Sequence, residues 1–470
     1  MWRSGCNRDI SHKRVDGDGR MEEKYQVRKI EQIEEIQVRV PGSKSITNRA
    51  LLLAALSDKR CVLRGVLFSD DSRAFLDSLV KLGFRVEADE DSKDVVIWGM
   101  GGEIPNRQAA IHVRSAGTAA RFLTVMLALA GGEYQLDASV QMCRRPMQPL
   151  LDVLKDAGVA FEFLGEENHF PFRMKSDCLS LDEVSIDTKV SSQFASALFM
   201  SGVLLKKGLK VNLLGDRAGG SYIKMTLAVM EQFGIKVSRE GNVCRIPYKP
   251  DFGLVEYQVE PDVSGACYFY AMAPLLKTEV VVRDVHMNSM QGDIKFIEAL
   301  KDMGCAVTEQ EQGVQVSGKE LGIYPGLELS MKDFSDQTMT MAALAPFAHG
   351  AMVIKNIGHI RFQETDRVQG ILTELRRMGI RCEEVPELDG IKIYPGEIKE
   401  TEVETYEDHR MAMAFTLVGL KTGKITIKNP GCCRKTFENY FELIDSLYKQ
   451  AGIFGCRASG LQTKKFETEE

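Results

Sequence analysis

Residues 38–56, VRVPGSKSITNRALLLAAL, place two cations and a hydroxyl group at the start of an apolar helix. Lys44, Ser45 and Arg49 fall around its first turn, where the helix dipole is positive and backbone N–H groups are unpaired. A helix start of this kind can bind an anion. It is not a P-loop, because Ser43 rather than Gly precedes the lysine and the upstream Gly is missing. Taken alone, the segment would also fit a capped helix with solvated charges.

Five more cations lie in or beside strongly apolar segments, where an unpaired charge is costly. They are Arg121, Arg145, Arg367, Arg410 and Lys435. For any one of them, a carboxylate within the protein would be a sufficient partner. For all five together with the cations at 44 and 49, a polyanionic ligand is the better account. Guanidinium groups match carboxylate and phosphate in bidentate fashion, and Lys supplies a compact charge that can also move a proton.

The helices that must position these cations recur along the chain. Apolar stretches rich in small residues begin near Ser45, Gly117, Ser192, Ser264, Gln337 and His409. Successive starts are about 72 residues apart, and a near-constant period of this length indicates duplication of one unit. Between them, amphipathic helices are closed by glycines that suit the left-handed end of a helix, each followed by a strand-like run. These are Gly83, Gly158, Gly234, Gly304 and Gly379. The unit is interpreted as βαβαββ with one helix buried on all sides.

Length and composition agree with six such units. A chain of 470 residues exceeds what one hydrophobic core usually supports, so two domains of three units each are expected. The formal net charge of −6 argues against a nucleic-acid surface. No apolar run reaches the roughly 18 residues that a membrane span needs. Eleven Cys without metal-site spacing predict reduced thiols in a cytoplasmic protein and no bound metal.

Several longer motifs then carry a resemblance. In chain order they read PGSKSITNRALLLAAL, SAGTAARFLT, MCRRPMQPLLD, SSQFASALFMSG, FSDQTMTMAALAPFA, IRFQETDRVQGILTELRRMG, YEDHRMAMAFTL and CRKTFENYFE. Over about residues 25–447 the chain resembles the 5-enolpyruvylshikimate-3-phosphate synthase family. The resemblance implies a two-domain inside-out α/β barrel built from six βαβαββ repeats, three per domain. It divides the chain into an N-terminal extension 1–21, a domain 22–42 plus 262–448, a domain 43–261 and a C-terminal tail 449–470.

The resemblance also implies an activity. It is the transfer of the enolpyruvyl group of phosphoenolpyruvate to the 5-hydroxyl of shikimate 3-phosphate through a tetrahedral intermediate, with release of phosphate. No cofactor, metal, nucleic acid or membrane is implied, and a monomer is expected. Both substrates carry a carboxylate and a phosphate, so the cleft must neutralise several anionic groups while it excludes water. The phosphoenolpyruvate mimic glyphosate is the inhibitor expected for such a site.

The family's site residues carry over to positions of this sequence. The shikimate 3-phosphate group comprises Lys44, Ser45, Arg49, Ser191, Ser192, Gln193 and Asp336. The phosphoenolpyruvate group comprises Lys44, Gly117, Arg121, Arg145, Gln193, Arg367, Arg410 and Lys435. Lys44, Asp336 and Glu364 are the catalytic residues, with Asp336 serving the 5-hydroxyl and Glu364 the methylene carbon. His409 is expected to orient Arg410.

Some positions of this sequence depart from the family pattern. The departures are Gln363 for the usual Lys, Gly219 and Ser221 before Tyr222, Ser115 for Asn, and Phe122 for Pro.

Two other functions are alternatives to this activity. One is that of the sister transferase that acts on UDP-N-acetylglucosamine and uses a loop Cys as acid. That Cys lies further upstream of Arg-Pro than Cys143 does, so the register fails. The other is a non-catalytic paralogue that binds shikimate 3-phosphate, which loss of a catalytic residue would have favoured.

Overall fold

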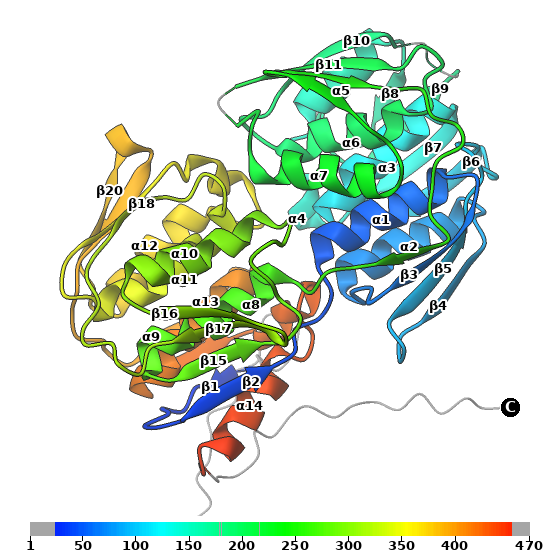
Figure 1. Cartoon of the computed structure of the whole chain (residues 1–470). Coiled ribbons are helices and arrows are strands. Elements are labelled where there is room, and N and C mark those ends of the chain that lie inside the picture. The colour runs from blue at the N-terminus through cyan, green and yellow to red at the C-terminus, as the bar shows by residue number, and fades with distance from the viewer. Residues whose placement is uncertain (1–23, 178, 180, 216, 454–470) are drawn as a thin grey trace, which may run out of the picture.

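The computed structural model describes residues 24–177, 179, 181–215 and 217–453. The predicted extension 1–21 lies outside these residues, as does the predicted tail after residue 453. The described chain forms two lobes joined at a narrow junction (Figure 1). In the part of the chain that is described, no helix is long and apolar enough to cross a membrane.

Each lobe has its own hydrophobic core. One core draws its buried residues from 46–259, and the other draws them from 25–40 and 263–448. The change from one core to the other falls where the chain passes between the lobes, and Gly42 and Pro261 pair there as a bridge of two antiparallel segments. On this basis we propose two domains with the boundaries predicted from the sequence, domain 1 (22–42 plus 262–448) and domain 2 (43–261).

Three sheets lie in each lobe, one for each predicted unit. The unit that is easiest to follow consists of β6 (Gln108–His112), α3 (Gly117–Ala130), β7 (Gly132–Asp137), α5 (Gln148–Asp156), β8 (Ala160–Phe163) and β9 (Phe172–Ser176). The first two strands are parallel and the last two pairs are antiparallel, which is the predicted βαβαββ order. The same order recurs in the unit from β10 (Glu183–Asp187) to β13 (Val243–Ile246) and in the unit from β18 (Glu328–Ser330) to β21 (Gly390–Ile393).

The other three sheets complete themselves with strands from distant parts of the chain. β14 (Glu256–Gln258) runs parallel to β3 (Arg60–Arg64), and β2 (Glu35–Val38) runs parallel to β15 (Glu279–Val282). In the last unit, β1 (Lys24–Gln26) closes a sheet that has three strands among the described residues. The ends of the repeat array are therefore joined through space rather than along the sequence.

The predicted buried helices are confirmed. They are α1 (Lys44–Leu56), α3, α6 (Ser192–Gly202), α8 (Val263–Tyr270), α11 (Thr338–Leu344) and α13 (His409–Thr422), and each begins within one residue of its predicted start. The glycines expected to close the second series of helices have φ angles between 86° and 103°, so their left-handed conformation is also confirmed. Because most strands alternate buried and exposed residues, the sheets turn one face to the helices and the other to solvent.

The second series of helices comprises α2 (Asp70–Lys81), α5, α7 (Ser221–Gln232), α10 (Lys295–Asp302), α12 (Arg367–Arg377) and α14 (Tyr440–Gln450). Two short helices, α4 (Val140–Cys143) and α9 (Met272–Leu276), complete the set. The remaining strands are β4 (Val86–Asp89), β5 (Asp94–Trp98), β10 (Glu183–Asp187), β11 (Leu209–Leu214), β12 (Ser238–Glu240), β13 (Val243–Ile246), β16 (Ala306–Gln310), β17 (Gly313–Ser317), β18 (Glu328–Ser330), β19 (Met352–Lys355), β20 (Cys382–Val385), β21 (Gly390–Ile393), β22 (Thr401–Val403) and β23 (Ile425–Lys428).

Candidate active site

A pocket of about 850 Å³, counting the part open to solvent, lies where the two lobes meet. It brings together residues from both domains that are far apart in the sequence. Its lining includes the predicted site residues Lys44, Ser45, Arg49, Gly117, Arg121, Arg145, Ser191, Ser192, Gln193, Asp336, Glu364, Arg367 and Arg410. The remaining predicted residue, Lys435, lies behind Glu364 with its Nζ 3.2 Å from Oε1 of that carboxylate.

Helix starts position these side chains. Lys44, Gly117, Ser192 and Arg367 are the first residues of α1, α3, α6 and α12, and Arg410 is the second residue of α13. Side-chain caps hold four of these starts, since Ser43, Ser191, Asp366 and Asp408 each accept a hydrogen bond from the first turn. Several positive helix ends therefore face one pocket, and they add to the charge of the cations there.

Two cations of domain 2, Arg49 and Arg121, are held by neutral groups. Arg49 donates from Nε to Thr226 Oγ1 at 2.8 Å and from Nη1 to a main-chain carbonyl. Arg121 donates from Nη1 to Gln193 Oε1 at 3.1 Å and to two main-chain carbonyls. Burial lowers the pKa of Arg49 to about 10, and burial with the nearby Arg145 holds the pKa of Arg121 well below its usual value. These two guanidinium groups are short of negative charge, which a bound anion would supply.

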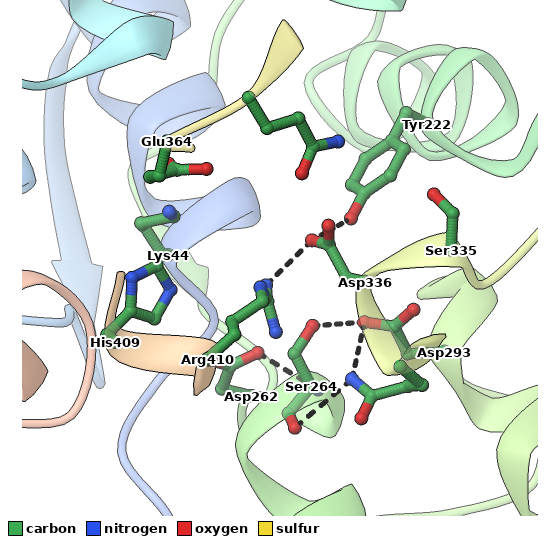
Figure 2. Close-up of polar contacts among 12 residues, drawn as sticks. Lys44, Tyr222, Asp262, Ser264, Asp293, Ser335, Asp336, Glu364, His409 and Arg410 are labelled. Carbon is green, nitrogen blue, oxygen red and sulfur yellow. Dashed lines mark hydrogen bonds and ion pairs between the residues drawn. The ribbon is translucent and has the colours of Figure 1, made fainter. Parts of the chain in front are cut away.

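Domain 1 surrounds the same pocket with paired charges. Figure 2 shows Arg410 and Tyr222 converging on the carboxylate of Asp336. Arg410 Nη2 lies 2.6 Å from Oδ2, Tyr222 donates its hydroxyl to the same oxygen at 2.6 Å, and Arg367 Nη1 lies 3.1 Å from Oδ1. Burial acts to raise the pKa of Asp336, but Arg410 and Arg367 outweigh it and hold the pKa below its usual range.

Glu364 is the second carboxylate of this wall. It lies 2.9 Å from Arg367 Nη2, 3.2 Å from Lys435 Nζ and 3.7 Å from Arg145 Nη1. Although burial acts to raise its pKa, Lys435, Arg367 and Arg145 hold the pKa of Glu364 well below its usual value. Arg367 also pairs through Nε with Asp408 Oδ2 at 2.8 Å. One buried guanidinium thus joins three carboxylates, and both predicted catalytic acids are ionised.

The structure adds site residues that the sequence analysis did not assign. Asp71 is buried with Oδ2 3.5 Å from Lys44 Nζ, and Tyr222 and Asp408 contact the carboxylate wall. Asp408 stands in the quoted YEDHRMA motif and before a buried helix, so its N-cap position was readable. Asp71 has no comparable signal, because its partner Lys44 lies on another helix.

His409 forms no hydrogen bond to Arg410, so any effect on the orientation of that arginine comes through packing. Among the described residues neither of its ring nitrogens has a hydrogen-bond partner, and burial together with Arg410 holds the pKa of His409 well below its usual value. Arg410 is instead held by Asp336 and by the hydroxyl of Tyr268, which accepts from Nη1 at 3.2 Å. His409 is a neutral packing residue of α13.

The departures from the family pattern have visible consequences. Gln363 turns its Oε1 to Arg367 Nη1, so it adds an acceptor where a cation is usual. The ring of Phe122 lies 5.6 Å from the guanidinium carbon of Arg49, and this face of an aromatic ring suits a cation. Ser115 shares a hydrogen bond with Ser139 at 2.7 Å, which ties the start of α3 to the start of α4.

Comparison with known proteins agrees with this geometry. A model of the family described as EPSP synthase (3-phosphoshikimate 1-carboxyvinyltransferase) matches residues 27–444. A 3-phosphoshikimate 1-carboxyvinyltransferase of Nostoc punctiforme is 40% identical over 415 residues, covering 88% of this chain and 96% of the relative. A 3-phosphoshikimate 1-carboxyvinyltransferase of Neisseria gonorrhoeae is 38% identical, covering 88% of this chain and 96% of the relative. An EPSP synthase structure from Acinetobacter baumannii is similar in fold, with a TM-score of 0.74 and 24% identity over 90% of this chain and 98% of that one.

Proposed function

The chain belongs to the EPSP synthase family, and we propose that the pocket between its domains carries the family's reaction through the residues assigned below. That reaction is the transfer of the enolpyruvyl group of phosphoenolpyruvate to the 5-hydroxyl of shikimate 3-phosphate, with release of phosphate. The observation that carries the assignment is the pocket itself. It sets two cations that are short of negative charge opposite two ionised carboxylates, so it can hold anions and move protons.

Asp336 accepts the proton of the 5-hydroxyl as that oxygen attacks C2 of phosphoenolpyruvate, and Glu364 delivers a proton to the methylene carbon. The product of this addition is the tetrahedral intermediate. In the elimination, the phosphate group leaves from C2 and takes up the proton that Asp336 holds, while Glu364 takes a proton back from the methyl carbon, which restores the double bond. Asp336 and Glu364 each end the reaction in the protonation state in which they began it.

The cations also set when these proton transfers become possible. Arg367, Arg145 and Lys435 hold the pKa of Glu364 down, and they belong to the predicted phosphoenolpyruvate group. A substrate carboxylate and phosphate that engage them would weaken their hold on Glu364, and its pKa would rise toward the range useful for a general acid. Substrate binding thus prepares the acid that the reaction needs.

The test is phosphate release from phosphoenolpyruvate with either of two acceptors. We expect release with shikimate 3-phosphate and none with UDP-N-acetylglucosamine. Release with the nucleotide sugar alone would favour the sister transferase, whose Cys acid stands at a position before Arg-Pro that Cys143 does not match. Binding of shikimate 3-phosphate without turnover would favour the non-catalytic paralogue.

We also propose a monomeric protein of the cytoplasm. All predicted site residues come from one chain and meet in one pocket, so the site needs no partner subunit. Light scattering coupled to size-exclusion chromatography should give a mass near 52.4 kDa, and a mass of twice that value at micromolar concentration would refute the monomer.

A further inference from the structure

Helix α4 lies at the junction between the two lobes (Figure 1). It belongs to domain 2 and follows the tie between Ser115 and Ser139. Its residue Gln141 reaches across to domain 1 with both ends of its amide. Nε2 donates to the main-chain carbonyl of Glu364 at 2.9 Å, and Oε1 accepts from Lys435 Nζ at 3.4 Å.

We propose that Gln141 is a positioning residue that fixes Glu364 against Lys435 when the two domains come together. The inference rests on the proposed role of Glu364 as the acid of the reaction. Glu364 stands in the link between the short 3-10 helix Gly358–Phe362 and the start of α12 at Arg367, so its own helix does not hold its backbone. A hydrogen bond to its carbonyl from the other domain supplies that restraint.

Lys435 also needs a restraint on its position. It ends the 3-10 helix Pro430–Lys435, and it is 7% exposed. Its ammonium lies between the carboxylate of Glu364 and the amide oxygen of Gln141. Because one amide group contacts both residues, it sets the direction from which the ammonium approaches the carboxylate. A neutral amide does this without adding charge, so it affects orientation rather than the attraction of anions.

Two kinds of contact thus reach Glu364 from domain 2. Arg145 contributes charge at 3.7 Å, and Gln141 contributes geometry. The two differ in what their loss should do. Loss of the cation weakens binding of phosphoenolpyruvate, whereas loss of the amide leaves binding intact and lowers the rate of the protonation step.

Gln141→Met tests this, because Met is of similar length and cannot make either hydrogen bond. We expect kcat to fall about tenfold, the size of one or two hydrogen bonds, while the KM values for both substrates change less than twofold. We also expect the basic limb of the kcat–pH profile, which reports the group that must be protonated, to move to higher pH, since a misplaced Lys435 lowers the pKa of Glu364 less effectively.

Val140→Ala is the matched control. Val140 precedes Gln141 on the same short helix, and its side chain is 71% exposed, so kcat and the pH profile should stay at the wild-type values. A Gln141→Met variant that keeps wild-type kcat and an unmoved pH profile would overturn the proposal, and so would a rise in KM with unchanged kcat. Failure of the proposed function is a separate outcome, because wild type would then release no phosphate with shikimate 3-phosphate.

Discussion

The two walls of the pocket solve different electrostatic problems. On the domain 2 wall, Arg49 and Arg121 contact hydroxyl, amide and carbonyl oxygens, and burial lowers the pKa of each. On the domain 1 wall, Arg367 and Arg410 contact carboxylates. Burial lowers the pKa there too, but Asp408 near Arg367 and Asp336 near Arg410 outweigh it and raise both pKa values above the ordinary one. Arg49 and Arg121 have no carboxylate against them in these contacts, whereas Arg367 and Arg410 are balanced by carboxylates.

The difference teaches how one pocket can both attract anions and move protons. A wall of unpaired cations gains most from a bound phosphate or carboxylate, since the ligand relieves the burial of charge. A wall of paired carboxylates keeps its acids ionised and ready until a ligand competes for their cations. The two walls contact each other, because Tyr222 and Gln141 of domain 2 contact Asp336 and Glu364 of domain 1.

The largest effect is expected from variants that abolish proton transfer at the domain 1 wall. Asp336→Asn and Glu364→Gln keep the shape of each side chain but not its ability to exchange a proton, so each should lower kcat by about 10²- to 10⁴-fold. Calorimetry should show shikimate 3-phosphate binding to both variants with less than tenfold loss of affinity. A kcat within threefold of wild type for either variant would remove that residue from the mechanism.

The second prediction sets one arginine of each wall against the other. Arg367→Met leaves three buried carboxylates with a missing partner, so the free energy of unfolding should fall by about 3–5 kcal/mol. Arg121→Met removes a buried charge that no carboxylate balances, so stability should change little. Its effect should appear in the binding of phosphoenolpyruvate. The binding free energy should weaken by about 2–5 kcal/mol, the worth of a desolvated charge contact, and the KM for phosphoenolpyruvate should rise accordingly.

Urea unfolding and steady-state kinetics on both variants check this contrast. The walls would not differ as argued if Arg121→Met destabilised the protein as much as Arg367→Met does. The reverse result in kinetics, an unchanged KM for phosphoenolpyruvate in Arg121→Met, would remove that arginine from the substrate group.

The helices, the glycines that end them and several cations of the pocket could be predicted from the sequence, because their signals are local. The six buried helices are apolar on all sides and start at caps such as Ser191 and Asp408, and the glycines that end the second series need only their own backbone conformation. An Arg inside an apolar helix, such as Arg121, is an anomaly that the sequence displays directly. Local patterns of this kind fix element type and position with little help from the rest of the fold.

The features that sequence could not supply depend on distant partners. β14 and β3 pair although almost the whole of domain 2 separates them, and a three-residue strand such as β14 has too short a pattern to identify its neighbour. Asp71 and Gln141 are polar residues on ordinary helices. Their roles come from Lys44 and Glu364, and Gln141 is 223 positions from Glu364. Only the folded chain brings such pairs together.

A third prediction concerns Asp293, a buried carboxylate of domain 1. Asp293 lies behind Asp336 (Figure 2) and accepts hydrogen bonds from the Ser264 hydroxyl and, at 3.4 Å, from Gln337 Nε2. Burial and the charge of Asp336 raise the pKa of Asp293 to about 6. The folded protein therefore binds a proton there that the unfolded chain has released. Stability should fall as pH rises from about 4 to about 6, by on the order of 2 kcal/mol.

Asp293→Asn should remove this pH dependence, and Asp336→Asn should only weaken it, because burial is a larger cause of the raised pKa of Asp293 than the charge of Asp336. The pKa of Asp336 is depressed, so its contribution has the opposite sign and is lost as pH falls below the ordinary carboxyl range. Chemical denaturation of wild type and both variants at several pH values between 4 and 7 measures the difference. Equal slopes for wild type and Asp293→Asn would mean that Asp293 is already ionised at pH 4.

The smallest expected effect tests the cationic wall at its closest approach to a ligand. A Cβ on Gly117 would lie 2.6 Å from Arg121 Nη1 and 2.7 Å from Arg145 Nη1. Both atoms are ends of flexible side chains, so Gly117→Ala should fold normally while its methyl group displaces two cations and narrows the pocket. Glyphosate is bulkier than phosphoenolpyruvate, and steric exclusion should therefore weaken the inhibitor more than the substrate. We expect the ratio of the glyphosate inhibition constant to the phosphoenolpyruvate KM to rise by about tenfold.

Gly165→Ala serves as the control for this variant, because a Cβ there would meet only Pro171 Cδ at an ordinary 3.6 Å, in an exposed segment of the same domain. Its two constants should match those of wild type. If domain 2 provides anion binding and domain 1 the proton chemistry, Gly117→Ala should alter affinities and leave kcat within about threefold of wild type. A fall in kcat with no change in the ratio would place Gly117 with the proton chemistry and break the division between the two walls.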